Sequence, residues 1–422
     1  MKNKTGYLNI LKEELTKAMG CTEPIAISYL ACYLKDILGY IPDTIDVFVS
    51  GNILKNVKSV VVPNTYGMRG IRTAVAIGVI GGKKELKLEC LSKITNDDIL
   101  NCKKYLEDVT INIYNKDSNF TFDIHMILKY KDKTCEGRIV DNHTNIVYLK
   151  KNDEILMNQS LNNDKRISNL TDHSILNVSD IYEFANEIDI EEVKDLINEQ
   201  IKCNMMIAKV GLDNNYGANI GKTLLKSFPN DISIKAKAYA AAASDARMNG
   251  CELPVVINSG SGNQGITCSV PVIIYAREMN VSEEKLIRAL VLSNLLTAHI
   301  KTGIGRLSAF CGAVAAGCAA GASIAYLHND SLDVISHTIV NSLAIVSGII
   351  CDGAKASCAA KIASSVDAGI LGFKLYQEGN QFYSGDGIVS KGVENTIRNI
   401  GVIARDGMAE TDKEIINLML NN

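Results

Sequence analysis

The sequence predicts an α+β protein, with a small mixed α/β lobe and a larger, mainly α-helical domain that has small-residue helix packing. Three observations support this prediction. Residues 83–164 contain several short segments in which apolar and polar residues alternate, a pattern typical of strands. From Asp180 onward the pattern is mostly helical and becomes rich in Ala and Gly. The 422 residues include no Trp and only 6% aromatic residues, so aliphatic and small side chains must form the core.

The first 40 residues predict N-terminal helices that pack on the C-terminal domain. Leucines recur at helical spacing within residues 6–19. A second helix is expected shortly after Gly20, with Thr22 as its N-cap and Gly39 at its end. We therefore treat residues 1–40 as a helical segment that precedes the lobe.

Residues 41–165 are expected to form the small α+β lobe. Residues 44–67 alternate and are rich in Val, which predicts strands and loops, and residues 70–82 predict a buried helix with a Gly-rich end. Further strands are expected in the segments LKLEC, VTINIYN, FTFDIHMILKY, EGRIVDN and TNIVYLKK. The polar residues 158–179 predict a linker, after which residues 180–422 are expected to form the helical domain.

Composition and charge exclude several classes of protein. A net charge of -3 argues against a dedicated nucleic-acid binder, which would carry a basic excess. Residues 307–327 are uncharged and long enough to span a bilayer, but they are mostly Ala, Gly, Ser and Cys and would gain little from transfer to lipid. We expect this segment to be a buried helix, and the protein to bind neither nucleic acid nor membrane. A homo-oligomer is compatible with the sequence.

The twelve cysteines raise the question of compartment. The N-terminus shows no apolar segment followed by a small-residue cleavage site, so we expect a cytoplasmic protein with reduced thiols. In a reducing compartment, cysteines either fill the core or act as metal ligands and catalytic thiols.

Two segments of the chain carry the same cysteine pattern. Cys311 and Cys318 are seven residues apart, as are Cys351 and Cys358, and the leading cysteines are separated by 40 residues. On one helix, two such thiols lie about 10 Å apart along the axis, so one compact cluster would take one cysteine from each of two neighbouring helices. The leading cysteines follow Gly-containing stretches near element starts, and we interpret Cys318 and Cys358 as core residues. Packing alone would also explain any single cysteine here.

Cys21 is placed like these leading cysteines. It follows Gly20 and immediately precedes an expected helix start. The N-terminus of a helix lowers the pKa of a thiol and favours the thiolate that binds metal. No CxxC motif is present, so zinc-ribbon and ferredoxin-type sites are not indicated.

Several motifs resemble those of a known family. Residues 20–26 (GCTEPIA), 55–67 (KNVKSVVVPNTYG) and 258–265 (NSGSGNQG), with the regions around Cys311 and Cys351, are similar to the iron–sulfur-dependent serine dehydratase α-subunit superfamily. The similarity is strongest to its single-chain L-cysteine desulfidase branch. This resemblance implies a [4Fe–4S] cluster held by three cysteines, with one iron open to substrate. By position, the ligands would be Cys21, Cys311 and Cys351, with Cys318 or Cys358 as alternatives.

The same resemblance implies β-elimination on a small amino acid without pyridoxal phosphate. L-Cysteine would yield pyruvate, ammonia and sulfide, and L-serine would yield pyruvate and ammonia. A thiolate leaving group suits iron, and L-cysteine is the expected substrate. L-Serine is the alternative, because the same open iron could hold a thiolate or a hydroxyl. The open iron would act as a Lewis acid on the group that leaves.

A polar loop is the expected binding site for the carboxylate of the substrate. Residues 254–265 run from a strand-like segment into a Gly, Ser and Asn loop whose backbone N–H groups can bind an anion. The side chains that we expect to take part are Ser259, Ser261, Asn263 and Gln264. Asn64 and Thr65 lie in a second polar turn that either assists or is an ordinary turn.

The general base is expected just before Cys311 in the chain. His299 and Lys301 lie there, and either side chain can accept a proton near neutral pH in a suitable environment. The rival candidates are Lys55, Lys58 and Lys355. Glu23 either supports Cys21 or is an ordinary acidic residue in the first turn of a helix.

Two alternatives belong to other functional classes. Residues 260–265 match G-x-G-x-x-G, which would indicate a dinucleotide-binding oxidoreductase. Against this, Pro271 lies where a long helix should continue, and the chain lacks an alternating βαβ pattern around the motif. A non-enzymatic helical binding protein with purely structural cysteines would bind no iron.

Overall fold

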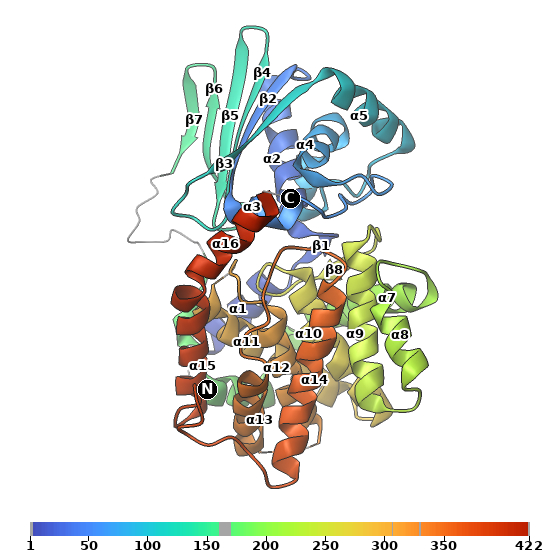
Figure 1. The fold of residues 1–422 in the computed structure, drawn as a ribbon, viewed down its shortest axis with the longest axis vertical. Coiled ribbons are helices and arrows are strands. Elements are labelled where there is room, and N and C mark those ends of the chain that lie inside the picture. The colour runs from blue at the N-terminus through green and yellow to red at the C-terminus, as the bar shows by residue number, and fades with distance from the viewer. Residues whose placement is uncertain (1–2, 160–169, 306, 329–330, 421–422) are drawn as a thin grey trace.

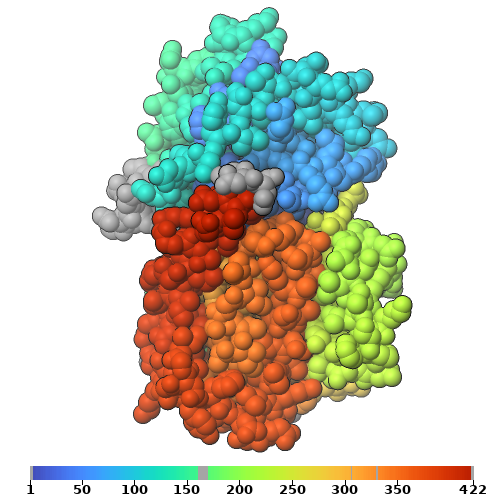
Figure 2. All heavy atoms as spheres, in the orientation of Figure 1, coloured from blue at the N-terminus to red at the C-terminus, as the bar shows by residue number. Residues whose placement is uncertain are grey.

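The computed structural model describes residues 3–159, 170–305, 307–328 and 331–420. A lobe built on a six-stranded sheet lies at one end of the molecule, and a helical domain forms the rest (Figure 1). The predicted α+β class is confirmed. Figure 2 shows the C-terminal segment, in red, running along the helical domain up to the junction with the lobe.

The sheet of the lobe is mixed, in the order β3-β2-β4-β5-β6-β7. Strands β2 and β3 pair in parallel and the remaining pairs are antiparallel. The parallel pair requires a crossover connection, which three helices and a 3-10 turn provide. The strands are β2 (Thr44–Ser50), β3 (Thr110–Lys116), β4 (Asp123–Tyr130), β5 (Lys133–Val140), β6 (Ile146–Lys151) and β7 (Glu154–Asn158); the crossover holds α3 (Gly51–Val57), α4 (Gly70–Gly81), η1 (Lys84–Glu89) and α5 (Asn96–Asp108).

Helix α2 (Thr22–Leu38) lies against this sheet and shares its core, which differs from the expectation for residues 1–40. Gly137 of β5 admits the side chain of Leu34, since a Cβ atom there would lie 2.8 Å from Leu34 Cδ2. Only α1 (Lys4–Glu14) packs in the core of the helical domain. Because α2 is apolar on almost all sides, its sequence does not reveal which layer it covers. Gly39 does end the helix, with a φ of 81°.

Two further segments of the lobe differ from expectation. The segment LKLEC (residues 86–90), for which a strand was expected, lies mostly in the 3-10 helix η1, where Lys87 has a φ of 46°. Residues 51–57 form helix α3, where strands and loops were expected. The expected helix over residues 70–82 is confirmed as α4. Residues 160–169 of the predicted linker lie outside the described residues.

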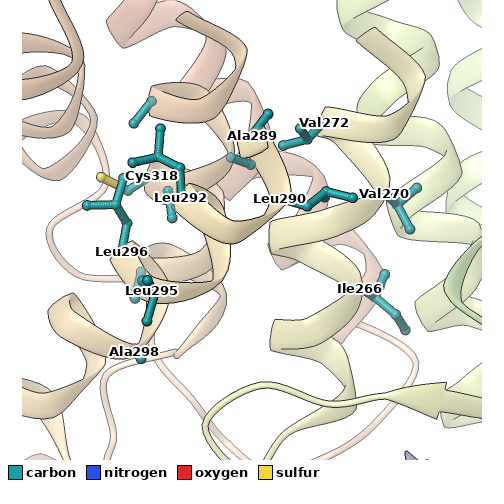
Figure 3. Close-up of a cluster of buried hydrophobic side chains, with 14 of the residues drawn as sticks. Ile266, Val270, Val272, Ala289, Leu290, Leu292, Leu295, Leu296, Ala298 and Cys318 are labelled. Carbon is teal, nitrogen blue, oxygen red and sulfur yellow. The ribbon is translucent and has the colours of Figure 1, made fainter. Parts of the chain in front are cut away.

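The helical domain is built around α12, whose side chains are buried along its full length. Figure 3 shows the neighbouring α10 and α11 contributing aliphatic side chains to the same core, with Cys318 among them. A short antiparallel pair of β1 (Lys17–Met19) and β8 (Pro254–Val256) lies on the side toward the lobe. The helices are α6 (Val178–Glu187), α7 (Lys194–Asp213), α8 (Ile220–Ser227), α9 (Ile232–Met248), α10 (Gly262–Glu278), α11 (Glu283–Ile304), α12 (Ala313–Leu327), α13 (Leu332–Ile345), α14 (Cys358–Gln377), α15 (Val393–Val402) and α16 (Ala409–Leu420).

Small residues let α12 and α14 cross with their backbones in contact. A Cβ atom on Gly369 would lie 2.1 Å from the carbonyl oxygen of Gly317, and one on Gly321 would lie 2.3 Å from that of Gly369. The predicted small-residue packing is therefore present. Within the described residues, no helix is long and apolar enough to cross a membrane.

Candidate active site

The two segments that carry the leading cysteines lie side by side. The backbone N–H of Cys311 donates to the carbonyl of Ile349 at 2.9 Å, and that of Cys351 donates to the carbonyl of Ala309 at 2.6 Å. This antiparallel bridge brings the thiols of Cys311 and Cys351 into hydrogen-bond contact. The contact raises the pKa of Cys311 and lowers that of Cys351, which the charges of Lys55 and Lys301 lower further.

Cys358 is the third thiol at this place. It is the first residue of α14, and its charge interacts with Cys311 and Cys351. All twelve cysteines are described, and these three are half-buried whereas the other nine are buried. Cys318 is one of the nine, with its Sγ directed to the carbonyl of Ile339 at 3.6 Å. The three half-buried thiols of the chain therefore lie in one region of the structure, close enough for their charges to interact.

Cys21 lies at the start of α2 and is only 2% exposed. It occupies the N-cap position itself, so the helix begins at Thr22 and the expectation that Thr22 is the N-cap is wrong. The Sγ atom of Cys21 donates to Oε2 of Glu23 at 3.0 Å. Burial and the charge of Glu23 raise the pKa of the Cys21 thiol well above its usual value. Glu23 is held in turn by Asn56, 3.2 Å away.

The loop at residues 258–264 connects the Cys21 side of the site to the Cys311 side. Thr22 Oγ1 donates to the carbonyl of Gly260 at 3.1 Å, which fixes the loop beside Cys21. Gln264 is 5% exposed and packs against Gly312, where a Cβ atom would lie 2.6 Å from its Cδ. Ser259 adopts a φ of 49°, and its hydroxyl donates to Asn258 Oδ1 at 2.8 Å. Ser261 occupies the N-cap position of α10.

The second polar turn lies next to Gly20. A Cβ atom on Gly20 would lie 2.2 Å from Cγ of Pro63, so only glycine fits beside this turn. Asn64 donates to the carbonyl of Leu91 at 2.6 Å, and Thr65 donates to the carbonyl of Val62 at 2.7 Å. Both side chains hold the turn in place.

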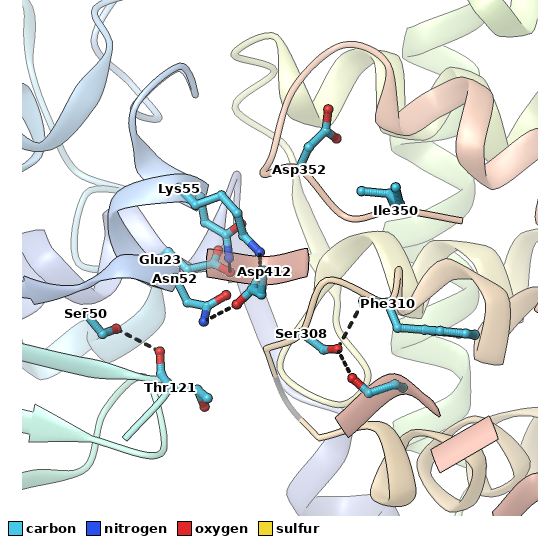
Figure 4. A network of polar contacts seen from close by, with 12 residues as sticks. Glu23, Ser50, Asn52, Lys55, Thr121, Ser308, Phe310, Ile350, Asp352 and Asp412 are labelled. Carbon is cyan, nitrogen blue, oxygen red and sulfur yellow. Dashed lines mark hydrogen bonds and ion pairs between the residues drawn. The ribbon is translucent and has the colours of Figure 1, made fainter. Parts of the chain in front are cut away.

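Of the two expected bases, the structure brings Lys301 to the thiols. Lys301 is 4% exposed, and its charge acts on Cys351. His299 instead hydrogen-bonds Glu394 of α15 at 2.8 Å. Among the rival lysines, Lys55 is also buried near Cys351 and pairs with Asp412 (Figure 4). Lys58 donates to the carbonyl of Met419, and Lys355 pairs with Asp352.

Arg247 of α9 is a site residue that the sequence analysis missed. Its side chain is 4% exposed, and Nη1 donates to Oδ1 of Asn263 at 3.1 Å. Asn263 also accepts from the hydroxyl of Ser244 at 3.2 Å. Burial raises the pKa of Cys21 and of Cys358, and the positive charge of Arg247 opposes that rise at both thiols. The only signal in the sequence is an Arg that closes an Ala-rich, otherwise buried helix.

Comparison with known proteins identifies the family. Residues 83–417 match the family described as serine dehydratase alpha chain. The chain belongs to the serine dehydratase α-chain family. It is 57% identical to a UPF0597 protein of Desulfitobacterium hafniense strain Y51, over 98% of this chain and 96% of the relative. Further UPF0597 proteins are 48% identical in Treponema denticola (99% and 98% covered) and 47% identical in Finegoldia magna (100% of each). This family membership supports a lyase of the dehydratase type and confirms the resemblance.

Membership of the serine dehydratase α-chain family also bears on the dinucleotide alternative. The expectation that Pro271 interrupts the helix is wrong, since α10 continues through it to Glu278. Within the described residues, the strand before the motif, β8, pairs with β1 alone and runs antiparallel to it. A dinucleotide fold needs a parallel sheet at this point, so the topology argues against it.

Proposed function

We propose that this protein is a [4Fe–4S]-dependent lyase that carries out β-elimination on L-cysteine and releases pyruvate, ammonia and sulfide. The observation that carries the proposal is the meeting of three half-buried thiols, Cys311, Cys351 and Cys358, beside buried cationic side chains. Family membership supports the dehydratase-type reaction. The choice of a C–S bond over a C–O bond rests on the preference of iron for a thiolate leaving group.

The thiols fit a cluster better than they fit a single ion. Among the described residues, no three His, Cys, Asp or Glu side chains converge on one metal-ion position. A [4Fe–4S] cluster takes its thiolates on different irons, so its ligands need not converge in that way. When bound, the cluster would supply an open iron that acts as a Lewis acid on the leaving group.

The third ligand that we propose is Cys358 in place of the expected Cys21. Cys358 interacts with both Cys311 and Cys351 and shares their partial exposure. Cys21 is buried and engaged with Glu23. The positive charges of Lys55 and Lys301 favour the thiolate form of Cys351, which is the form that binds iron.

The α-proton of the substrate must pass to a base of the protein. We take Lys301 as the first candidate, because it lies near Cys351 whereas His299 hydrogen-bonds Glu394 of α15. To accept the α-proton, Lys301 must first give up its own proton. The Cys21 thiol with the carboxylate of Glu23 is the second candidate, because Thr22 ties it to the substrate loop. Exchange of the α-proton of a bound amino acid with deuterated solvent, followed in K301Q and C21A, distinguishes the two candidates. The variant that retains the cluster but loses exchange identifies the base.

The direct test is an anaerobic assay of sulfide and pyruvate release from a panel of small amino acids. L-Serine is the second candidate substrate, because the family is described as serine dehydratase. Sulfide released from L-cysteine in step with pyruvate supports the proposal, whereas pyruvate from L-serine alone favours the second candidate. Anaerobically reconstituted protein should carry about four iron and four sulfide per chain. Colourless, iron-free protein would contradict the cluster.

A further inference from the structure

The buried cation of Arg247 has no anionic partner in the described part of the chain. Its only hydrogen bonds run from Nη1 to Asn263 Oδ1 and, more weakly, to Met248 Sδ at 3.9 Å, and Nε has none. A guanidinium stays charged at any pH near neutrality. Burial of an unpaired charge is unfavourable, so a position that keeps such a charge is suited to receiving an anion.

The first turn of α10 faces this guanidinium. A Cβ atom on Gly262 would lie 2.3 Å from Nε of Arg247, so the glycine is what allows the side chain to reach the helix end. The first backbone hydrogen bond of this 17-residue helix is donated by the N–H of Gly265 to the carbonyl of Ser261. The preceding N–H groups and the helix dipole therefore add to the attraction for a negative charge.

The same turn also presents an acceptor without a partner. Oε1 of Gln264 is buried and makes no hydrogen bond, and its side chain lies against Gly312, next to Cys311. An α-amino acid carries one anionic group that needs donors and one ammonium group that needs acceptors. Arg247 supplies a charged donor and Gln264 supplies an acceptor; Arg247 is hydrogen-bonded to Asn263, the residue that precedes Gln264 in the chain.

We propose that Arg247, with the first turn of α10, binds the carboxylate of the substrate, and that Oε1 of Gln264 accepts a hydrogen bond from its ammonium group. This inference rests on the proposed function and deepens it, because it names the residue that selects α-amino acids over simple amines. Arg247 contacts the substrate without taking part in proton transfer or in iron binding.

Binding of L-alanine and of L-alaninamide tests the inference. The two ligands have the same size, carry no leaving group and differ in the charge of one end. Isothermal titration calorimetry, on the reconstituted and on the iron-free protein, should show that L-alanine binds roughly 10- to 100-fold more tightly than L-alaninamide. This is the difference expected for a charge-assisted hydrogen-bonded pair. R247Q should bind both ligands about equally, and R247K should retain part of the preference, since it keeps the charge but not the planar fork.

Arg277 provides the matched control, because it lies exposed in the last turn of the same helix. R277Q should keep the full preference for L-alanine. The inference is overturned if R247Q still prefers L-alanine, or if the wild-type protein does not distinguish the two ligands. Loss of iron from R247Q without change in the preference would also overturn it, since Arg247 would then only balance the charge of the thiolates. Because no turnover is measured, a protein that lacks lyase activity can still pass this test.

Discussion

The ammonium of Lys55 and the carboxylate of Asp412 form an ion pair that joins α3 of the lobe to α16 (Figure 4). The two side chains are 1% and 15% exposed, and Asn52 donates to the same carboxylate at 2.8 Å. Lys55 also lies close enough to Cys351 to lower the pKa of its thiol. The last helix of the chain is thereby coupled to the thiol site through one buried cation.

Replacement of Asp412 by Asn should destabilise the protein. Loss of the carboxylate leaves Lys55 buried with no counter-charge from α16, which costs about 3 kcal/mol for a largely buried pair. Urea unfolding of the wild-type and D412N proteins measures this difference. Lys55 should also become less well positioned beside Cys351, so the iron of a reconstituted cluster should be lost faster from D412N.

Asp406 supplies the control for this substitution. It pairs with Arg405, but both side chains are more than half exposed, so water already screens the pair. D406N should leave the urea midpoint and the iron content unchanged. Equal effects of D406N and D412N would show that any lost acid near the C-terminus weakens the protein, and that the pair with Lys55 has no special role.

Replacement of Gly369 by Ala should force α12 and α14 apart. The new methyl group would overlap the backbone of Gly317, which cannot move aside as a flexible side chain can. Overpacking of this kind costs roughly 1–3 kcal/mol, so the free energy of unfolding should fall by about that amount. Because α14 begins at Cys358 and α12 begins two residues after Cys311, iron content should fall as well.

Gly348 is the control for the helix crossing. A Cβ atom at this position would have no neighbour within 4 Å. G348A should match the wild-type protein in stability and iron content, and a comparable loss in G348A would contradict the argument from close packing.

The fold class followed from local patterns that tertiary contacts did not override. The alternation of apolar and polar residues predicted strands β4 to β6. The Gly- and Ala-rich composition predicted closely packed helices, which are present as α12 and α14. The partner of an element was harder to predict. Helix α2 is apolar around its circumference, so its sequence is equally compatible with the lobe and with the helical domain. The segment LKLEC alternates like a strand, but the chain turns at Lys87, which has a positive φ, and η1 forms instead. No local propensity of these residues indicates that turn.

The thiol site was only partly predictable, because one assumption about helix register does not hold. The repeated spacing placed Cys318 and Cys358 one step along a helix from the leading cysteines. Cys318 does lie inside α12, but Cys311 precedes that helix. Residues 351–357 form a loop, and α14 begins only at Cys358. The loop folds Cys358 back toward Cys351, and the separation of about 10 Å along a helix does not apply.

Single replacements by Ser should separate the proposed ligands from the other thiols. C358S should lose most of its iron after anaerobic reconstitution, because hydroxyl is a poor ligand for iron and the site loses one of three thiolates. C21S should retain its iron, since Cys21 is engaged with Glu23. Iron and acid-labile sulfide analysis measures both outcomes. The reverse result, iron lost from C21S and kept in C358S, would restore the ligand set implied by the family resemblance.

Cys318 is the control for these replacements. It is fully buried in α12, and its nearest polar contact is the carbonyl of Ile339. C318S should keep its iron, because the serine hydroxyl can donate to the same carbonyl. Loss of iron from C318S at unchanged stability would contradict the assignment of this residue to the core.

The last prediction concerns Asp245, a carboxyl on α9 that is 1% exposed. Burial raises its pKa to about 6, although the N–H of Gly221 donates to Oδ2 at 3.2 Å. A carboxyl whose pKa is raised on folding costs stability once it ionises in the folded state. The cost is therefore absent below the unfolded pKa of about 4, grows as the pH rises toward 6 and is complete at pH 7.

Replacement of Asp245 by Asn removes the charge and keeps an acceptor for Gly221. D245N should be more stable than the wild-type protein at pH 7, by up to about 3 kcal/mol, and the gain should shrink at about pH 5. Urea unfolding of both proteins at the two pH values gives the difference in their free energies of unfolding. The contributions of the other titrating groups cancel in this difference. The raised pKa would be contradicted if the stability of D245N relative to the wild type did not fall between pH 7 and pH 5, since the linkage requires that pH dependence.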